Sequence, residues 1–225
     1  MIGSDMKPTQ VAPLTRRAWL AHCSVALALP AVPGPSAATR PAKVLVVGDS
    51  LSAEYGIARG SGWVALLAQR LQREQPGATV VNASVSGDTT SGGRTRLPAL
   101  LEQTKPTHVI VELGSNDALR GLPLTMTRDN LAAMLRAVRR SGARPLLVGM
   151  RMPPNYGRSY TQEFEAMFVA LAKAEDAALV PFLLAGVADA PDSRSLFQDD
   201  RIHPNAQAQA IIAGNVWPVL RKQLR

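Results

Sequence analysis

The feature that most constrains the fold is a regular alternation of short apolar runs with helical patterns from residue 43 to about residue 222. Five short runs rich in apolar residues have strand length, and the first of them is continuous, as expected of a strand covered on both faces. These are residues 43–47, 79–83, 107–113, 145–150 and 178–182. Strands that alternate with helices predict a single α/β domain, with a parallel sheet, right-handed crossovers and helices on both faces.

The helical patterns lie between these runs. The clearest has Leu131, Met134, Leu135 and Val138 at i, i+3, i+4 and i+7, and Gly142 can close that helix. Similar apolar patterns fall within residues 63–71, 97–101, 164–171 and 211–220. We expect the last helix to begin near residue 205, where an asparagine can cap it.

The first 38 residues have the character of an export signal rather than of a folded domain. Arg16 and Arg17 precede a mostly apolar run over residues 18–32, and Ser36 and Ala38 offer a cleavage site of small residues. Residues 15–20 also resemble a twin-arginine signal, so the general secretory and twin-arginine routes both stay open. The run is too short for a stable membrane anchor. We expect an exported protein, periplasmic or secreted, whose mature domain covers residues 39–225.

Charge and composition narrow the range of partners. The chain has 25 Lys and Arg against 17 Asp and Glu, but aromatic residues make up only 4% of it. Nucleic-acid readers often interleave aromatic and basic residues, and no such tract is present, so no nucleic-acid partner is expected. The single cysteine, Cys23, lies in the expected leader. The mature chain would therefore have neither a disulfide nor a thiol nucleophile.

Polar segments directly follow the first three expected strands. They cover residues 48–52, 84–90 and 114–117, and a fourth polar segment, residues 200–204, precedes the last expected helix. The carboxyl ends of parallel strands meet at one edge of a sheet, where ligand sites of such folds lie. The first three segments should therefore gather at one edge.

Ser50 lies in the first of these segments, at an expected strand-to-helix turn. Such a turn presents the hydroxyl outward and directs amide N–H groups at developing negative charge, although a serine there is also a common helix cap. A nucleophilic serine needs a base. Of the three histidines, His22 lies in the leader and His108 begins a strand, which leaves His203.

An acid and a set of hydrogen-bond donors would complete such a site. Asp200, three residues before the remaining histidine, can accept from its Nδ1–H, and Asp199 is the competing acid. The candidate donors to an oxyanion are the backbone N–H groups of Ser50 and Gly87 and the side-chain amide of Asn116, which could instead be a plain turn residue.

Taken together, these segments resemble the four sequence blocks of the SGNH (GDSL) hydrolase superfamily. The matching residues are Gly48–Ser52, Gly87, Gly114 with Asn116, and Asp200 with His203, in the family's order. The chain is more closely similar to the periplasmic arylesterase, acyl-CoA thioesterase and lysophospholipase branch. The segments that carry this closer resemblance are residues 86–90, 96–101, 111–117, 119–121 and 155–157.

The resemblance implies a flavodoxin-like three-layer α/β/α sandwich with a five-stranded parallel sheet. Ser50 would be the nucleophile, His203 the base and Asp200 its orienting acid, while Ser50, Gly87 and Asn116 would form the oxyanion hole. No cofactor and no metal are implied. The implied substrate-binding residues are Asp49, Leu51, Gly114, Asn155, Tyr156 and Pro204. Two positions depart from the branch, because Ser115 and Ala118 stand where it usually has glycines.

The activity implied is hydrolysis, through an acyl-enzyme, of aryl and short-to-medium acyl esters and also of thioesters or lysophospholipids. Apolar residues of the loops support this choice, namely Leu119, Leu122, Leu124 and Met152, and residues 152–157 resemble a loop that borders the acyl pocket in that branch. A carbohydrate O-deacetylase of the same superfamily is the alternative hydrolase.

Two other classes of protein fit the fold less well. A flavin- or nucleotide-binding module is possible on the fold alone, but Gly93 occupies the position of the phosphate-binding lysine in the P-loop-like stretch 87–93. A metal phosphatase using Asp49, Asp117 and Asp200 would leave the spacing of the asparagine and histidine blocks unexplained.

Overall fold

The structure is a computed structural model that describes residues 1–2 and 41–225, so the expected export signal lies outside the described residues. Residues 40–225 form one compact unit. Its five strands form a parallel sheet in the order β2-β1-β3-β4-β5. The strands are β1 (Lys43–Gly48), β2 (Thr79–Asn82), β3 (His108–Glu112), β4 (Arg144–Val148) and β5 (Ala178–Val180). The predicted α/β fold with a five-stranded parallel sheet is confirmed.

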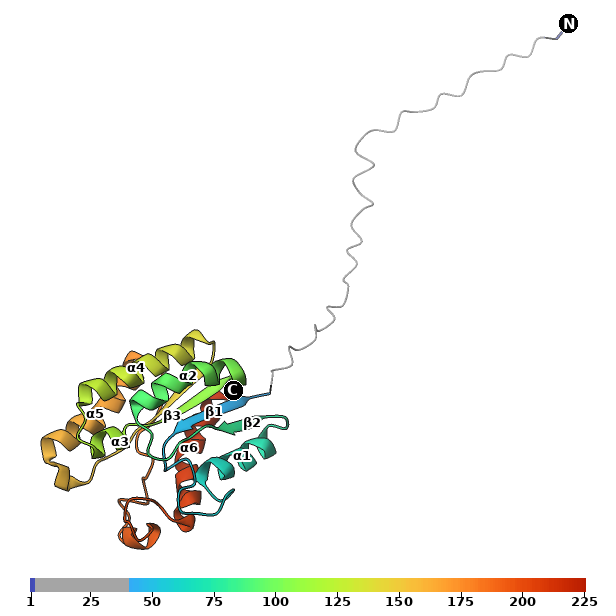
Figure 1. Ribbon diagram of the computed structural model, residues 1–225. Helices are drawn as coiled ribbons and strands as arrows, with labels where there is room; N and C mark the ends of the chain where they lie inside the picture. The colour runs from blue at the N-terminus through green and yellow to red at the C-terminus, as the bar shows by residue number, and fades with distance from the viewer. Residues whose placement is uncertain (3–40) are drawn as a thin grey trace. The chain divides into compact units, whose positions relative to one another are not determined.

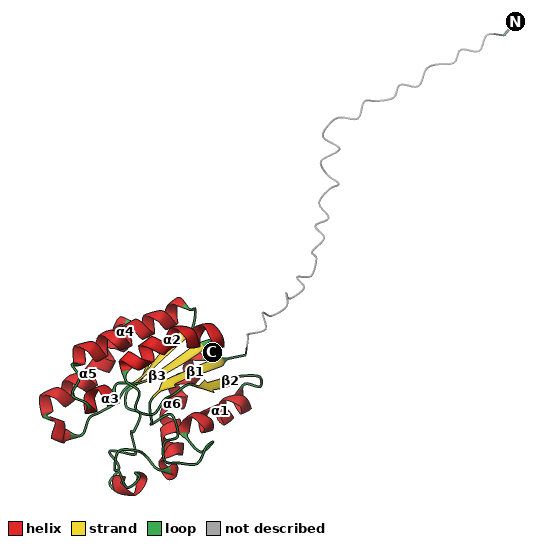
Figure 2. Cartoon of the chain, in the orientation of Figure 1, coloured by secondary structure: helices red, strands yellow, loops and turns green. Residues whose placement is uncertain are grey.

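Helices cover both faces of this sheet (Figure 1). On one face lie α2 (Thr90–Thr104), α4 (Leu124–Arg140) and α5 (Arg158–Ala174), and on the other lie α1 (Trp63–Glu74) and α6 (Gln209–Gln223). The remaining short elements are α3 (Ser115–Leu119), η1 (Pro154–Tyr156), η2 (Ser193–Leu196) and η3 (Ala206–Ala208). The architecture is thus a three-layer sandwich, with the yellow strands of Figure 2 between the helices.

The sheet forms the centre of the hydrophobic core. The side chains of β3 are buried along its whole length, and β1 is buried after its first residue. The apolar stripe predicted from Leu131 to Val138 faces the core from α4. Burial of these side chains accounts for the apolar runs in the sequence, because both faces of a central strand are removed from water.

Two helical segments differ from the sequence prediction. The helical pattern at residues 97–101 belongs to a longer helix, because α2 begins at Thr90 in the glycine-containing stretch, where the Thr89 side chain accepts from Gly92 N to cap it. Gly93 is inside this helix, where a Cβ would lie 2.3 Å from Leu113 Cδ1. Glycine at this position lets α2 approach β3 closely, so packing outweighs its low helix propensity. The one-turn helix α3 was not predicted either.

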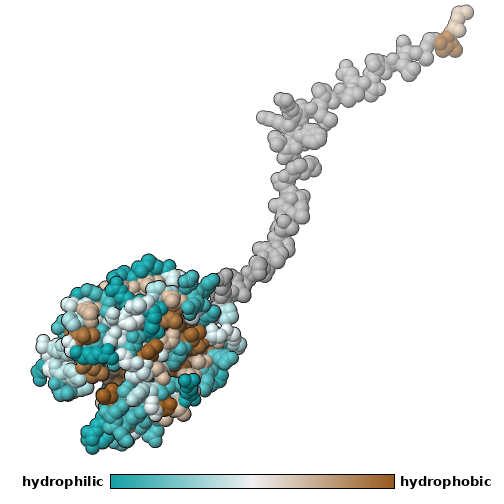
Figure 3. All heavy atoms as spheres, viewed as in Figure 1, coloured by the Kyte–Doolittle hydropathy of each residue, from teal (hydrophilic) through white to brown (hydrophobic). Residues whose placement is uncertain are grey.

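The described residues contain no helix long and apolar enough to cross a bilayer. The face of the molecule seen in Figure 3 is mostly hydrophilic, with small and separate apolar areas.

Candidate active site

Ser50 lies two residues beyond the carboxyl end of β1, in the turn that leaves the sheet. The turn is closed by Asp49, whose carbonyl accepts from Ser52 N at 3.2 Å and Ala53 N at 3.0 Å. The serine side chain is partly exposed, whereas Asp49 on one side is buried. This short helical turn therefore presents the serine hydroxyl at the edge of the sheet and fixes its position through the neighbouring backbone.

His203 approaches this hydroxyl from the segment before α6. Its Nε2 lies 2.8 Å from Ser50 Oγ, and its Nδ1 lies 2.6 Å from Asp200 Oδ2. When Nδ1–H donates to the carboxylate, Nε2 is left unprotonated and can accept from the serine hydroxyl. The structure thus brings Ser50, His203 and Asp200 into one hydrogen-bonded chain. Asp199, the competing acid from the sequence, has no hydrogen bond to the imidazole.

The turn that carries Asp200 and His203 is fixed by its own backbone. Arg201 adopts a positive φ of 58°, which turns the chain sharply between the acid and the histidine. Asp200 Oδ1 then accepts from Ile202 N at 2.9 Å and from His203 N at 3.0 Å. Desolvation alone would raise the pKa of Asp200, but these hydrogen bonds and the imidazole outweigh it and lower the pKa to about 2. The acid is therefore ionised at any physiological pH.

Two backbone N–H groups that the sequence offers as oxyanion donors have no acceptor among residues 41–225. They belong to Ser50 and Gly87, the latter in the loop after β2 with a φ of 78°. The loop around Gly87 is held from the side by Arg120, whose Nη2 donates to Gly87 O at 2.8 Å. These N–H groups are therefore free to donate to a substrate oxygen, as an oxyanion hole requires.

Asn116, the third donor predicted, lies at the start of α3 beside the same turn. Its Nδ2 donates to Asp49 Oδ2 at 3.0 Å and to Asp88 O at 3.0 Å. Both amide hydrogens are therefore engaged within the protein in this state. Donation to a substrate oxygen would require this amide to share or exchange one of these bonds. The two bonds also join the loops that follow β1, β2 and β3.

A pair of buried carboxyl groups lies beneath the turn. Glu112, fully buried on β3, accepts at Oε2 from Ser52 Oγ at 2.7 Å and from Asp49 N at 3.3 Å, while its Oε1 has no partner. Burial, followed by the neighbouring Asp49 charge, raises the pKa of Glu112 well above its usual value. Burial also raises the pKa of Asp49, to about 6, against the hydrogen bonds from Leu51 and Asn116. We infer that Glu112 is the neutral member of the pair at pH 7.

The residues expected to bind substrate fall into two groups. Asp49, Gly114 and Pro204 are buried, and Leu51 is partly buried. They shape the turns around Ser50 but expose little surface to a ligand. Asn155 and Tyr156 are exposed, in η1. Of the apolar loop residues, Leu119 is exposed and Leu122 partly buried, while Leu124 and Met152 are in the core.

The geometry bears on the other protein classes considered from the sequence. Residues 1–2 and 41–225 contain no cluster of three or more histidine, cysteine or acidic side chains able to hold a metal. Asp117, proposed for a phosphatase, instead accepts from Thr90 N at 2.8 Å and from Thr90 Oγ1 at 2.5 Å, which ties α3 to α2. His108 is buried and bonded to Thr107 Oγ1 and Gln223 O, a structural role.

Comparison with known proteins agrees with this geometry. Residues 46–211 match the family described as GDSL-like Lipase/Acylhydrolase. The chain belongs to this family. It is 48% identical over 181 residues to Esterase TesA of Pseudomonas aeruginosa, which covers 80% of this chain and 89% of that protein. It is 46% identical over 182 residues to Thioesterase 1/protease 1/lysophospholipase L1 of Escherichia coli (strain K12), which covers 81% of this chain and 83% of that protein.

Solved structures give the same result. The psychrotrophic esterase EstA from Pseudoalteromonas sp., inhibited by monoethylphosphonate, superposes with a TM-score of 0.76 at 38% identity, over 81% of this chain and 98% of that chain. The resemblance stated from the sequence, and with it the prediction of an ester hydrolase of the GDSL-like family, is confirmed.

Several residues around this GDSL-like site were missed by the sequence analysis. The Tyr55 ring lies 4.4 Å from the His203 ring, between centroids, at a tilt of 39°. Gln198 links the segments that carry them, because its Nε2 donates to Tyr55 O at 2.8 Å and its backbone N donates to His203 O at 2.8 Å. Arg96 holds the loop after β2 by donating to Asp88 Oδ2 at 2.8 Å and to Ala83 O, and links it to the end of β1 by donating to Gly48 O at 3.3 Å. Arg96 lies in a segment that carries the family resemblance, which could have indicated it. Tyr55 and Gln198 had no signal in the sequence.

Proposed function

We propose that this member of the GDSL-like family is a serine esterase with a Ser50–His203–Asp200 triad. The observation that carries the proposal is the continuous chain of hydrogen bonds from Asp200 through the imidazole to Ser50 Oγ, at 2.6 and 2.8 Å. The Ser50 hydroxyl attacks the ester carbonyl as Nε2 of His203 takes its proton. The imidazolium is stabilised by the ionised Asp200 and then returns the proton to the leaving oxygen.

The acyl-enzyme is hydrolysed by the same groups in reverse. A water molecule gives its proton to Nε2 of His203 and attacks the acyl carbonyl, and the proton then returns to Ser50 Oγ as the acid leaves. In both halves, negative charge develops on the carbonyl oxygen. We expect the N–H groups of Ser50 and Gly87, which have no acceptor among residues 41–225, to donate to this oxygen, and Asn116 to supply a third donor when its amide releases one of its present acceptors.

For substrates, we propose aryl and short-to-medium acyl esters, and also thioesters or lysophospholipids. The support is that relatives at 41–48% identity are named as an esterase, a thioesterase and lysophospholipase, and an arylesterase of Vibrio mimicus. Hydrolysis rates on p-nitrophenyl esters of increasing length, acyl-CoA thioesters, lysophospholipids and acetylated xylan would test this choice. Deacetylation of the polymer with negligible cleavage of simple esters would reject it in favour of a carbohydrate deacetylase.

The nucleophile can be tested separately from the substrate. Ser50→Ala should lower kcat on a p-nitrophenyl ester by roughly 10⁴-fold or more, because it removes the attacking atom. Ser86→Ala is a matched control, since this neighbouring serine is exposed and forms no side-chain hydrogen bond. A phosphonate ester should add one adduct mass to the peptide that contains Ser50. Near-native turnover by Ser50→Ala, or an adduct on another serine, would reject the mechanism.

We also propose that the protein is exported by its first 38 residues. The support is the arginine pair followed by the apolar run of residues 18–32. Cells expressing the full chain should release a protein that begins near residue 39 into the periplasmic or extracellular fraction. Replacement of Arg16 and Arg17 by Lys should retain the protein in the cytoplasm only if the twin-arginine route is used. An intact chain that stays in the cytoplasm would contradict export by either route.

A further inference from the structure

The charged side chains of the described domain are divided unequally between the two edges of the sheet. We call the edge where the strands begin and the five long helices end the amino pole, opposite the edge that carries Ser50. It comprises residues 41–43, 70–79, 100–108, 136–144, 170–178 and 219–225. These segments hold twelve Lys and Arg and four Asp and Glu, whereas the rest of residues 41–225 hold nine and twelve. The formal side-chain charge is +8 at the amino pole and −3 elsewhere.

All twelve cations are exposed at this edge. Those near the ends of α1, α4 and α5 are Arg70, Arg73, Arg136, Arg139, Arg140 and Lys173. Those at strand starts, in the loop after α2 and after the middle of α6 are Lys43, Lys105, Arg144, Arg221, Lys222 and Arg225. Hydrogen bonds join these segments, because Arg144 donates to Gln223 O and Arg139 donates to Glu175 O. The charge is therefore concentrated on one surface.

Helix stabilisation does not account for this charge. Cations stabilise helix C-termini, each of which carries a partial charge of about −0.5. Five helices end at this pole, which offsets only about 2.5 of the eight excess positive charges. Two of the four acids are already paired, Glu74 with Arg70 and Arg221, and Glu175 with Arg136. Most of the excess positive charge is therefore uncompensated, which raises the electrostatic potential over this surface.

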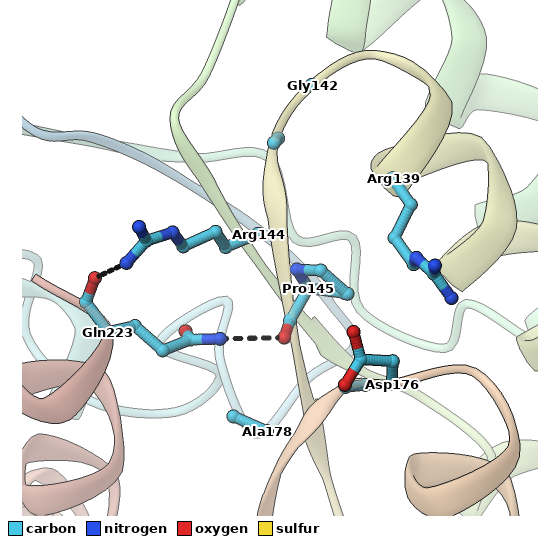
Figure 4. A pocket seen from close by; sticks show the side chains of 9 residues that line it. Arg139, Gly142, Arg144, Pro145, Asp176, Ala178 and Gln223 are labelled. Carbon is cyan, nitrogen blue, oxygen red and sulfur yellow. Dashed lines mark hydrogen bonds between the residues drawn. The ribbon is translucent and has the colours of Figure 1, made fainter.

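A cavity of about 560 Å³ lies within the amino pole (Figure 4). Arg139, Arg144, Asp176 and Gln223 are among the residues that line it. The Asp176 carboxylate would oppose a small anion bound there, and helix C-termini rather than anion-binding N-termini face this edge. The cavity is therefore a poor site for one phosphate, and the whole charged surface is the feature that needs a partner.

We propose that the amino pole docks on an anionic phospholipid bilayer. The described domain begins at this pole, at Pro41. Eight residues, 33–40, separate it from the apolar run of residues 18–32, and they span at most about 28 Å. Until the expected cleavage near residue 38, the cationic surface is within reach of the headgroups whenever that run enters a bilayer. Each Lys or Arg close to an anionic leaflet adds to the attraction.

The surface chemistry favours lipid over nucleic acid. None of the exposed large apolar side chains of the described residues lies at the amino pole, and the exposed aromatic residues, Tyr55 and Tyr156, lie outside it. The pole therefore lacks the stacking platforms that bind single strands, and also the apolar side chains that would insert into acyl chains. Binding would be electrostatic and peripheral. The site at Ser50 would face away from the bilayer, open to substrates in solution.

Vesicle sedimentation tests the proposal with the chain from residue 39 onward. This part is a fair test protein, because its match to EstA covers 98% of the EstA chain but only 81% of this one. Vesicles of phosphatidylcholine with 30% phosphatidylglycerol should bind it at least 100-fold more tightly than pure phosphatidylcholine, and 0.5 M salt should abolish the difference. Equal binding to both vesicles, or no binding to either, would overturn the proposal.

A pair of triple variants localises the surface. Arg140, Lys222 and Arg225 form no side-chain hydrogen bonds with other described residues, so changing all three to Gln should leave the fold and ester hydrolysis unchanged. Binding to anionic vesicles should weaken by about 100-fold, because each of the three cations contributes roughly five-fold. The matched control changes Arg59, Arg158 and Arg194, which are exposed and lie outside the amino pole, to Gln. Its binding to anionic vesicles should fall only slightly. Equal losses in both variants, or tighter binding of the parent to duplex DNA than to anionic vesicles at equal salt, would refute docking of this pole on lipid.

Discussion

Glu112 offers the sharpest test of how the site is supported, because it can be changed without touching a reacting atom. Glu112→Ala would leave the Ser52 hydroxyl and the Asp49 N–H buried without their acceptor. Each of the two unsatisfied groups costs about 1–3 kcal/mol, and the cavity adds about 1–2 kcal/mol, so the free energy of unfolding should fall by about 3–8 kcal/mol. Glu112→Gln keeps one oxygen acceptor but buries an NH₂ where Oε1 has no partner, and should cost about 1–3 kcal/mol at low pH.

The pH dependence separates a neutral from an ionised Glu112. The unfolded chain releases this proton near pH 4.5, whereas the folded protein keeps it to a higher pH. Between these values the folded state binds more protons, so the contribution of Glu112 to stability is fully present below pH 4.5 and is lost as pH rises. Gln has no proton to lose, and Asp49 is common to both proteins. The deficit of Glu112→Gln relative to wild type should therefore shrink from pH 5 to pH 9.

Urea unfolding at pH 5, 7 and 9 measures this deficit, with Glu102→Gln as the control for an exposed carboxylate on α2. A deficit that stays constant, or grows with pH, would show that Glu112 is ionised in the folded protein and would refute the assignment. Turnover provides a second measurement. Because Glu112 supports the turn that carries Ser50, Glu112→Ala should lower kcat more than it changes KM, and Glu112→Gln should restore most of it.

Three further outcomes are expected. Asp200→Asn should lower kcat by roughly 10³–10⁴-fold at every pH from 4 to 9, because the acid, with a pKa of about 2, is ionised throughout this range; a loss confined to one end would contradict its role. Asn116→Ala should lower kcat by roughly 10²–10³-fold on p-nitrophenyl esters with a smaller change in KM, whereas an effect on KM alone would indicate ground-state binding only. Gly93→Val should lower the thermal midpoint, measured by circular dichroism, by several degrees, because its Cβ would meet Leu113; an unchanged midpoint would show that α2 can shift freely.

The sheet was predictable from the sequence, and its shortest strand shows the limit. Short runs rich in apolar residues located all five strands, because both faces of the sheet are covered. The run at residues 178–182 yields only Ala178–Val180, since Pro181 cannot donate to a neighbouring strand. The start of α2 was not predictable, because two glycines argue against a helix. It forms because Gly93 allows close packing on Leu113, a tertiary contact that local propensity does not report.

The candidate site was predictable only where a residue type is rare. Three histidines allowed His203 to be selected, but its contact with Ser50 joins residues 153 positions apart, and no local pattern reports such a distance. Asn116 was selected by its place after β3, yet its bonds to Asp49 and Asp88 were not foreseen. The glutamine and tyrosine that support the histidine, Gln198 and Tyr55, are of common types in loops and gave no signal.

Glu112 did leave a signal, and its place in β3 explains the chemistry of the turn above it. A lone acid within an otherwise apolar strand must be paired, neutral or exposed, and on a central strand exposure is impossible. Glu112 is bonded to Ser52 and Asp49 but meets no cation, so neutrality is the state with the lowest cost. A neutral carboxyl leaves Asp49 free to be the ionised member, and that charge accepts from Asn116. The proton on β3 therefore favours an ionised Asp49, whose carboxylate accepts from Asn116 Nδ2 at 3.0 Å.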